Sequence, residues 1–193
     1  MRPTVLDDGY GVGPKLLFRL IRLMSGHPAP DAAKITFYRP DFYGSHMRQL
    51  THAAMRGPSM WSVGDRELMA AYISKLNECP FCVGAHTATA SRAYQDPDRV
   101  AAVLADLDSA PITEGLRATL RMLATLTAGG TVNAADVRSV LAAGVSPEQI
   151  EDALAVSFAF NTTDRLANAF DFDLLSAEGY EAGAKYLLKR GYK

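Results

Sequence analysis

Cysteine is scarce in this sequence of 193 residues, and its two cysteines, Cys79 and Cys82, lie within one short segment. A small secreted domain that depends on disulfides would have more cysteines spread along the chain. A bridge between these two would close a loop too short to restrain the unfolded chain appreciably. The sequence therefore excludes a disulfide scaffold, and any importance of the two thiols must lie in their chemistry.

Long apolar runs and a leader sequence are also missing. No stretch approaches the roughly 20 apolar residues that a membrane-spanning helix needs. Asp7 and Asp8 stand where a signal peptide would be basic. The apolar stretch 16–24 is interrupted by Arg19 and Arg22. These features predict a cytoplasmic protein with no membrane partner.

An excess of one charge is absent as well. The chain has 20 Lys and Arg residues against 21 Asp and Glu residues, a formal net charge of −1. Binding of nucleic acid would call for a basic surface, so no nucleic-acid partner is expected. Hydrophobic residues make up 48% of the chain, which is typical of a folded globular protein. At this length one domain, residues 1–193, is the expectation.

Helical periodicity is what the sequence has in abundance. Apolar residues recur at helix spacing in most segments, and Thr113, Asn133 and Ser146 are well placed to cap helices. Residues 25–40 are rich in Gly, Pro and small residues and predict a loop, with 35–38 as a candidate short strand. The pattern predicts an all-α domain of about eight or nine helices with an N-terminal extension, residues 1–40.

The basic, amphipathic segment 14–24 has two interpretations. It is typical of a terminal helix that docks on the core or on a neighbouring subunit, and the alternative is a helix that lies on a membrane surface. Its apolar face and the apolar C-terminal helices offer more adhesive surface than a small monomer usually exposes. We therefore expect a homo-oligomer.

Four side chains with reactive chemistry fall within residues 67–86, namely Glu67, Cys79, Cys82 and His86. If Pro80 opens a helix, Cys79 lies at its N-cap or first turn and Cys82 one turn further in. Residues three or four apart share one face of a helix, so Cys82 neighbours both Cys79 and His86. A disulfide between the cysteines is compatible with this spacing after a small adjustment.

The electrostatics of such a segment favour an activated cysteine. A helix N-terminus carries partial positive charge, which stabilises thiolate over thiol. His86 could accept or relay the proton. Glu67, on the preceding helix, could reach the same place if the two helices form a hairpin. Thiolate, imidazole and carboxylate would then form a proton relay that serves a cysteine nucleophile.

Other uses of these residues stay open. The pattern C-x-x-C-x-x-x-H supplies three of the ligands that zinc needs, and a metal could add Glu67. Haem attachment would require His directly after the second cysteine, where Val83 stands, and a thioredoxin-like site would require a βαβ context. The cysteines could also be merely small buried residues. We expect no cofactor and no resident metal.

The four residues resemble a family motif. In the alkylhydroperoxidase-like, peroxidase-related branch of the carboxymuconolactone decarboxylase superfamily, a Glu precedes a C-x-x-C by twelve residues, and a His follows four residues after the second Cys. This chain reproduces those spacings, and Ser74 and Asn77 match typical family positions. The resemblance is strongest over residues 50–130 and continues more weakly through residues 160–167.

The resemblance implies an all-helical fold that assembles as trimers or hexamers. It implies that Cys82 attacks a hydroperoxide and becomes a sulfenic acid, which Cys79 resolves to a disulfide. His86 and Glu67 would move protons. A dithiol protein, lipoyl-carrying or thioredoxin-like, would reduce the disulfide again. The best-known alkylhydroperoxidase has a second His just before the second Cys, whereas this chain has Phe81.

Two rival functions fit the same segment. One is a non-catalytic redox sensor, and the other is a lyase of the carboxymuconolactone decarboxylase type with His86 or Glu67 as acid–base groups. The remaining histidines, His27, His46 and His52, have no partner visible in the sequence and are interpreted as surface or packing residues. Trp61 and the tyrosines are assigned to the core or to interfaces.

Overall fold

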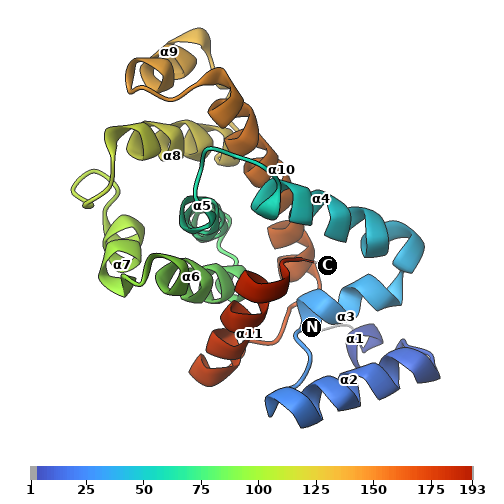
Figure 1. The fold of residues 1–193 in the computed structure, drawn as a ribbon. Helices are drawn as coiled ribbons and strands as arrows, with labels where there is room; N and C mark the ends of the chain where they lie inside the picture. The colour runs from blue at the N-terminus through green and yellow to red at the C-terminus, as the bar shows by residue number, and fades with distance from the viewer. Residues whose placement is uncertain (1–3, 193) are drawn as a thin grey trace.

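The computed structural model describes residues 4–192, which form eleven α-helices and one π-helical turn, with no strand among them (Figure 1). The all-α class is as predicted, while the predicted count of eight or nine helices is too low. The elements are α1 (Val5–Asp8), α2 (Val12–Ser25), α3 (Asp31–Tyr38), η1 (Pro40–Gly44), α4 (Ser45–Arg56), α5 (Val63–Leu76), α6 (Pro80–Tyr94), α7 (Pro97–Ala105), α8 (Glu114–Thr127), α9 (Ala134–Ala142), α10 (Pro147–Ala169) and α11 (Ala177–Arg190).

The loop predicted for residues 25–40 is the main correction. Residues 31–38, which include the candidate strand 35–38, form helix α3, and the π-helical turn η1 follows it. A lone strand would leave its backbone groups without partners, and no second strand exists among residues 4–192, whereas a helix satisfies its own backbone. Ile35 is buried, so the apolar signal in this segment marks a core position.

The three predicted cap residues located helix starts correctly. The side chains of Thr113, Asn133 and Ser146 accept backbone N–H groups at the starts of α8, α9 and α10. Ser62 and Asp65 form a reciprocal capping box at the start of α5. Each such cap contributes about 1 kcal/mol, and each sets the residue at which its helix begins.

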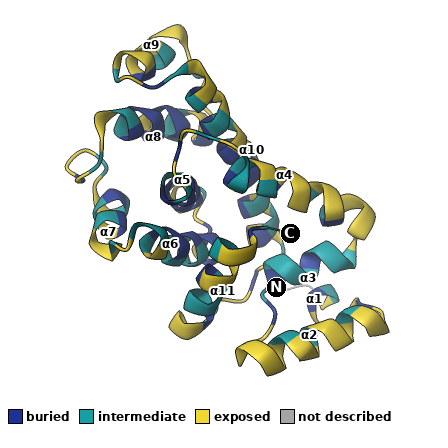
Figure 2. Cartoon of the chain, viewed as in Figure 1, coloured by how far each residue is buried: buried dark blue, intermediate teal, exposed yellow. Residues whose placement is uncertain are grey.

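Helix α5 is the central element of the fold. It contacts α4, α6, α7, α8 and α10, and Figure 2 shows it dark blue within the ring that they form. Nine of its 14 residues are buried, among them Leu68, Met69 and Ile73. A helix buried on all sides has no polar face to give to solvent. The ionisable residues that α5 buries, Arg66 and Glu67, therefore need partners from outside this helix.

Helices α5 and α6 form the hairpin that the proton-relay prediction requires. Three residues, 77–79, connect them, and Glu78 adopts a positive φ of 51° in this turn. Helix α11 packs against α6. Their approach is close at Gly84, because a Cβ built there would lie 2.5 Å from the ring of Tyr180. The start of α6 is thus held between α5 and the C-terminal helix.

The described part of the N-terminal extension lies against the cysteine segment. Leu6 of α1 and Ile35 of α3 belong to one apolar cluster with Cys79, Phe81 and Cys82. Helix α2 lies at the outer edge of the molecule, and none of its residues is buried (Figures 1 and 2). No helix within residues 4–192 has both the length and the apolarity needed to cross a membrane.

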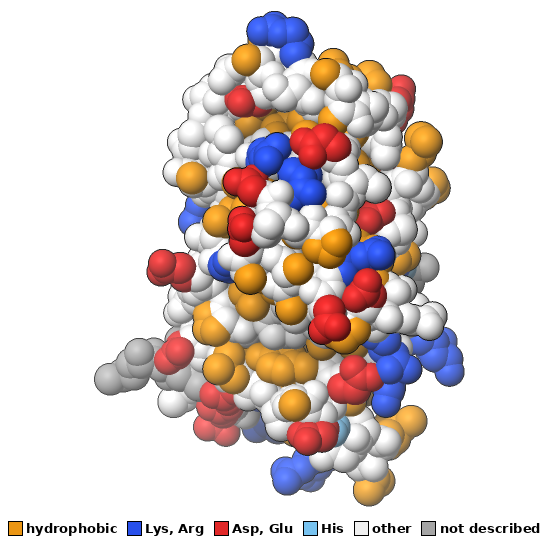
Figure 3. Space-filling model, turned by 90° about the vertical axis from the view of Figure 1, so that its left-hand side faces the viewer, with side chains coloured by type: hydrophobic (Ala, Val, Ile, Leu, Met, Phe, Trp, Pro, Cys, Tyr) orange, Lys and Arg blue, Asp and Glu red, His pale blue; other side chains and the backbone are white. Residues whose placement is uncertain are grey.

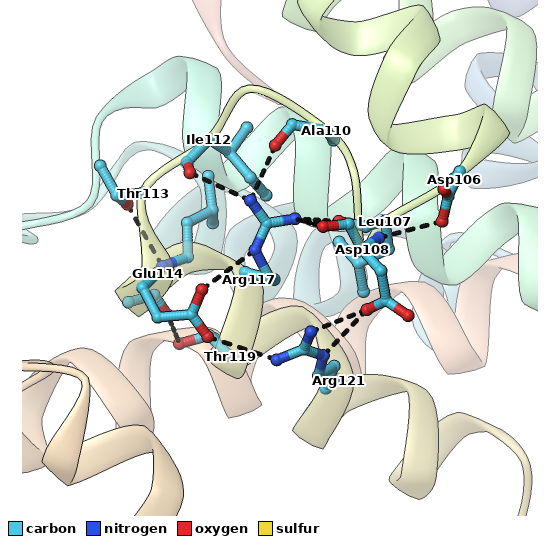
Figure 4. Close-up of polar contacts among 12 residues, drawn as sticks. Asp106, Leu107, Asp108, Ala110, Ile112, Thr113, Glu114, Arg117, Thr119 and Arg121 are labelled. Atoms are coloured by element: carbon cyan, nitrogen blue, oxygen red, sulfur yellow. Dashed lines mark hydrogen bonds and ion pairs between the residues drawn. The ribbon is translucent and has the colours of Figure 1, made fainter.

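The loop between α7 and α8 is held by one side chain, Arg117 (Figure 4). Its guanidinium group donates hydrogen bonds to four carbonyl oxygens of the loop, those of Leu107, Asp108, Ala110 and Ile112. Backbone groups that lie outside helices still need partners, and here one side chain supplies them. This arrangement sets the start of α8, which packs on α5.

Gly84→Ala is expected to lower the free energy of unfolding by about 1–3 kcal/mol, because the added methyl group would overlap the Tyr180 ring. Gly183→Ala is the matched control on α11, since a Cβ there meets nothing within 4 Å. It should be neutral or stabilise the helix by up to about 1 kcal/mol. Urea unfolding followed by circular dichroism gives both values. Equal effects would show that α6 and α11 are not in tight contact at Gly84.

A buried dithiol beside two buried carboxylates

The two cysteines are placed by the start of α6. Cys79 is the N-cap residue, and Pro80 occupies the first helical position, as predicted. Both thiols are free, and the two residues are 1% and 2% exposed. Their sulfur atoms lie within 4.8 Å of each other. A disulfide, with its bond of about 2 Å, is therefore reachable by side-chain movement.

Glu67 and His86 meet between α5 and α6. Nδ1 of His86 lies 2.7 Å from Oε2 of Glu67, and both side chains are buried. The other carboxylate oxygen, Oε1, accepts hydrogen bonds from Nη2 of Arg56 at 2.6 Å and from the hydroxyl group of Tyr192 at 2.9 Å. Glu67 therefore has three partners, from α4, α6 and the segment after α11.

The charge state of Glu67 follows from these partners. Burial raises the pKa of Glu67, but the hydrogen bonds and charges of His86 and Arg56 outweigh burial, so that its pKa is below the ordinary value. An ionised Glu67 holds Nδ1 of His86 as a hydrogen-bond donor. That leaves Nε2 of the neutral imidazole as the proton acceptor.

Two members of this cluster, Arg56 and Tyr192, were not predicted from the sequence. The guanidinium carbon of Arg56 lies 5.1 Å from the centroid of the Tyr192 ring. Gly191, with a positive φ of 69°, turns the chain after α11, and the backbone N–H of Tyr192 donates to Nδ1 of His52. The bond from Tyr192 to Glu67 spans 125 residues, and no local motif announces it. His52 thus has a packing role, which is to support this turn.

A second buried carboxylate, Asp164 of α10, lies beside the dithiol. It is 0% exposed, and one of its oxygens lies within 4.8 Å of each sulfur atom. Oδ1 accepts a hydrogen bond from the Ser74 hydroxyl group and Oδ2 one from the Asn77 amide, both at 2.9 Å. Burial raises the pKa of Asp164 in spite of these donors. Asp164 lies within residues 160–167, where the sequence resembles the family more weakly, but it was not singled out there as a site residue.

The two thiols differ in acidity. The thiol of Cys82 donates toward the sulfur of Cys79 and lowers the pKa of Cys79, although burial acts in the opposite direction. The pKa of Cys82 lies well above its ordinary value, because Cys82 donates this hydrogen bond, is buried and faces Asp164. The reduced pair therefore shares its first negative charge with most of it on Cys79. Cys82, to which the resemblance assigns attack, keeps its proton until a base removes it.

Apolar and aromatic side chains close the site. The ring of Phe81 meets Phe172 edge-on, with centroids 5.4 Å apart, and the ring of His86 meets Phe160 at 4.4 Å. Phe81 adds no titratable group where the best-known alkylhydroperoxidase has a histidine. These rings exclude water, which strengthens the charge interactions inside the site.

Residues 43–121 match the model of the carboxymuconolactone decarboxylase family. No curated protein sequence matches the chain. The matched segment contains the cysteines, Glu67 and His86, but neither Asp164 nor Tyr192.

Several solved structures share the fold. A peroxidase-related protein from Silicibacter sp. TM1040 is 24% identical, with a TM-score of 0.76 and 91% of each chain covered. An alkylhydroperoxidase AhpD core protein from Ralstonia eutropha JMP134, also peroxidase-related, is 22% identical, with a TM-score of 0.76 and coverage of 90% of this chain and 91% of that one. The debrominase Bmp8 is 15% identical, with a TM-score of 0.68 and the same coverage. These likenesses establish the fold, and the match of residues 43–121 agrees with the predicted resemblance to the carboxymuconolactone decarboxylase family.

Tyr192→Phe is expected to lower the free energy of unfolding by about 1–2 kcal/mol at pH 7, because ionised Glu67 loses one of its three donors. Tyr180→Phe is the control, since its buried hydroxyl group has no partner of good geometry among the described residues. It should cost nothing or stabilise the protein. Urea unfolding measures both.

The same pair of variants tests the charge of Glu67. Because the pKa of Glu67 is lowered on folding, its stabilising contribution is present above the unfolded value of 4.5 and is lost as the pH falls through the native pKa. The destabilisation caused by Tyr192→Phe should therefore shrink below pH 4.5. A cost that stays constant down to acid denaturation would contradict an ionised Glu67.

Proposed function

We propose that this protein is a cysteine-dependent peroxidase, or thiol–disulfide oxidoreductase, which reduces small hydroperoxides through Cys79 and Cys82. One observation carries the proposal. The two free thiols stand at the start of a helix, and the second of them, Cys82, lies one turn before a histidine that a buried carboxylate holds. The family match of residues 43–121 and the shared fold support the same chemistry.

The proposed cycle balances as follows. The thiolate of Cys82 attacks one oxygen of the hydroperoxide, the O–O bond breaks, and the alkoxide leaves as an alcohol after it takes up a proton. The thiolate of Cys79 then attacks the sulfenic sulfur of Cys82, and the hydroxyl group leaves as water with a second proton. A dithiol returns two electrons and two protons to the disulfide.

His86 and Glu67 would remove the proton from the thiol of Cys82. Since the pKa of Cys82 is raised, removal of its proton is the first task. His86, with Nδ1 bound to Glu67, presents Nε2 as the acceptor. The resulting imidazolium, stabilised by Glu67, can return the proton to the leaving alkoxide. The lowered pKa of Cys79 suits the second step, in which Cys79 acts as a thiolate.

The surroundings of the dithiol bear on its partners. A lipoyl-carrying or thioredoxin-like protein offers the dithiol chemistry that re-reduction needs, and a reducing compartment such as the cytoplasm suits the cycle.

Both sulfurs are buried, so their reaction requires local movement of the side chains that cover them, among them Leu6 and Ile35. The face in Figure 3 carries acidic and basic side chains interspersed, a mixture that suits a small neutral substrate.

The burial of both sulfurs favours one second candidate, a redox sensor in which the dithiol changes state without turnover. Such a protein would consume one oxidation equivalent per subunit and then stop under any reductant. A lyase that uses His86 or Glu67 would need neither thiol. Activity on a lactone acid that survives replacement of both cysteines by alanine would favour the lyase instead.

Cys82→Ser is expected to reduce peroxide consumption to the background of the added dithiol, because the attacking sulfur is gone. Cys79→Ser should also stop turnover but should still form a sulfenic acid on Cys82, which dimedone traps and mass spectrometry detects. Glu67→Gln should slow formation of the sulfenic acid, because His86 loses its anionic partner. Peroxide consumption is measured with a supplied dithiol.

Two outcomes would contradict this division of labour. If Cys82→Ser and the unchanged protein consume peroxide equally, the mechanism is wrong. If the dimedone adduct forms in Cys82→Ser but not in Cys79→Ser, the roles of the two cysteines are reversed, in line with the lower pKa of Cys79.

We also propose a homo-oligomer, a trimer or hexamer, in which α2 takes part. Several apolar residues of α2 are exposed, among them Val12, Leu16, Leu20 and Leu23. The expected light-scattering mass at micromolar concentration is a multiple of 20.8 kDa. Leu20→Glu should lower this mass, while Arg19→Gln on the same helix should not. A mass of 20.8 kDa for the unchanged protein would contradict the proposal.

A further inference from the structure

Three donor atoms of the kinds that zinc binds, two sulfurs and one carboxylate oxygen, meet at the start of α6. The sulfur atoms of Cys79 and Cys82 and one carboxylate oxygen of Asp164 all lie within 4.8 Å of one another, and all three residues are buried. Zinc holds thiolate sulfur at about 2.3 Å and carboxylate oxygen at about 2.1 Å, which places tetrahedral donors about 3.6–3.8 Å apart. The cluster needs a contraction of about 1 Å at most to reach this geometry.

The carboxylate of Asp164 is held as metal-bound carboxylates are. Ser74 donates to one of its oxygens and Asn77 to the other, and each oxygen keeps a further lone pair. Such outer partners orient a ligand and raise its affinity for metal. Arg56 pairs with Glu67, whereas Ser74 and Asn77, which donate to Asp164, carry no charge that would balance its carboxylate.

We propose that Cys79, Cys82 and Asp164 form a binding site for a divalent cation such as Zn²⁺, and that this site exists only in the reduced protein. Three protein ligands leave a fourth position for water or a small ligand, as in zinc sites that stay open on one side. The site differs from the metal alternative that the sequence left open, in which Glu67 was the additional ligand. Glu67 is instead engaged with Arg56.

The oxidation state of the dithiol decides whether the cation binds. Binding of M²⁺ by two thiols forms two metal–sulfur bonds and releases two protons, with no change of oxidation state. A disulfide between Cys79 and Cys82 removes both thiolate ligands at once. The cation and a hydroperoxide therefore compete for the same sulfurs, and the bound cation would keep the dithiol reduced and unreactive. Binding itself does not depend on peroxidase turnover.

The test is an anaerobic titration of the full chain, reduced and oxidised, with Zn²⁺ in competition with a chromophoric chelator. One Zn²⁺ per reduced chain is expected, with at least a hundredfold weaker binding after disulfide formation. Cd²⁺ in place of Zn²⁺ should add a thiolate-to-metal absorption band in the ultraviolet. Equal affinity in the two redox states, or no stoichiometric binding by the reduced chain, would overturn the proposal.

Asp164→Asn should weaken Zn²⁺ binding at least tenfold, whereas Glu67→Gln, which alters the other fully buried carboxylate, should change it less than twofold. An unchanged affinity in Asp164→Asn would reduce the site to an ordinary dithiol and refute the role of Asp164. If that variant does not fold, anomalous diffraction from Cd²⁺-loaded crystals of the unchanged protein decides the matter. The ion must then lie between both sulfurs and Asp164, and any other place refutes the site.

The outcome is separable from that of the proposed function, because no peroxide enters the titration. A protein that binds Zn²⁺ as described and never consumes peroxide would lose the peroxidase proposal alone. A protein that turns over peroxide but does not bind the cation would lose the metal site alone. Inhibition of peroxide consumption by stoichiometric Zn²⁺, reversed by a chelator, is expected where both hold.

Discussion

The burial of an ionised carboxylate, that of Glu67, is the constraint on which the rest of this structure depends. A charge with no exposure to water requires partners within hydrogen-bond distance, and Arg56, His86 and Tyr192 come from three separate parts of the chain to meet it. Removal of the charged partner Arg56 would leave the buried carboxylate uncompensated, at a cost of about 3–5 kcal/mol. The end of α4, the middle of α6 and the segment after α11 are thus fixed by the interaction that also orients the histidine.

The two buried carboxylates lie in surroundings that shift their pKa values in opposite directions. Glu67 is paired with a guanidinium group and an imidazole, and its pKa is lowered. The donors to Asp164, which are Ser74, Asn77 and the Cys82 thiol, are neutral, and burial raises its pKa. Environments that push the pKa values of two similar groups apart are a usual basis for separate acid–base roles. In this site Glu67 holds His86 ready to take a proton, whereas Asp164 makes the loss of a proton from Cys82 harder.

The parts that could be predicted from the sequence are those encoded locally. Caps such as Ser146 depend on residues within one helical turn, and they predicted helix starts correctly. The spacing of Cys79, Cys82 and His86 is equally local, and it predicted the position of the cysteines at the start of α6. The loop prediction for residues 25–40 was wrong. Gly and Pro suggested a loop, but Ile35 is buried, and a buried segment is favoured as a helix because a helix satisfies its own backbone. Tyr192 could not be found, since its contact with Glu67 arises only when α11 has packed on α6.

The dithiol and Asp164 would repel one another if all three groups were ionised, and this repulsion can be relieved in three ways. Three acidic groups in a small apolar volume cannot all be ionised without a compensating cation, because each added negative charge raises the pKa values of the others. In the reduced protein a proton retained on Cys82 relieves the repulsion, because the pKa of this thiol lies well above its ordinary value. A disulfide relieves the repulsion by converting two of the acids into a neutral bond, and a divalent cation relieves it by binding all three. The same burial that makes the thiols reluctant to ionise thus gives both oxidation and metal binding a driving force, and it makes the two mutually exclusive.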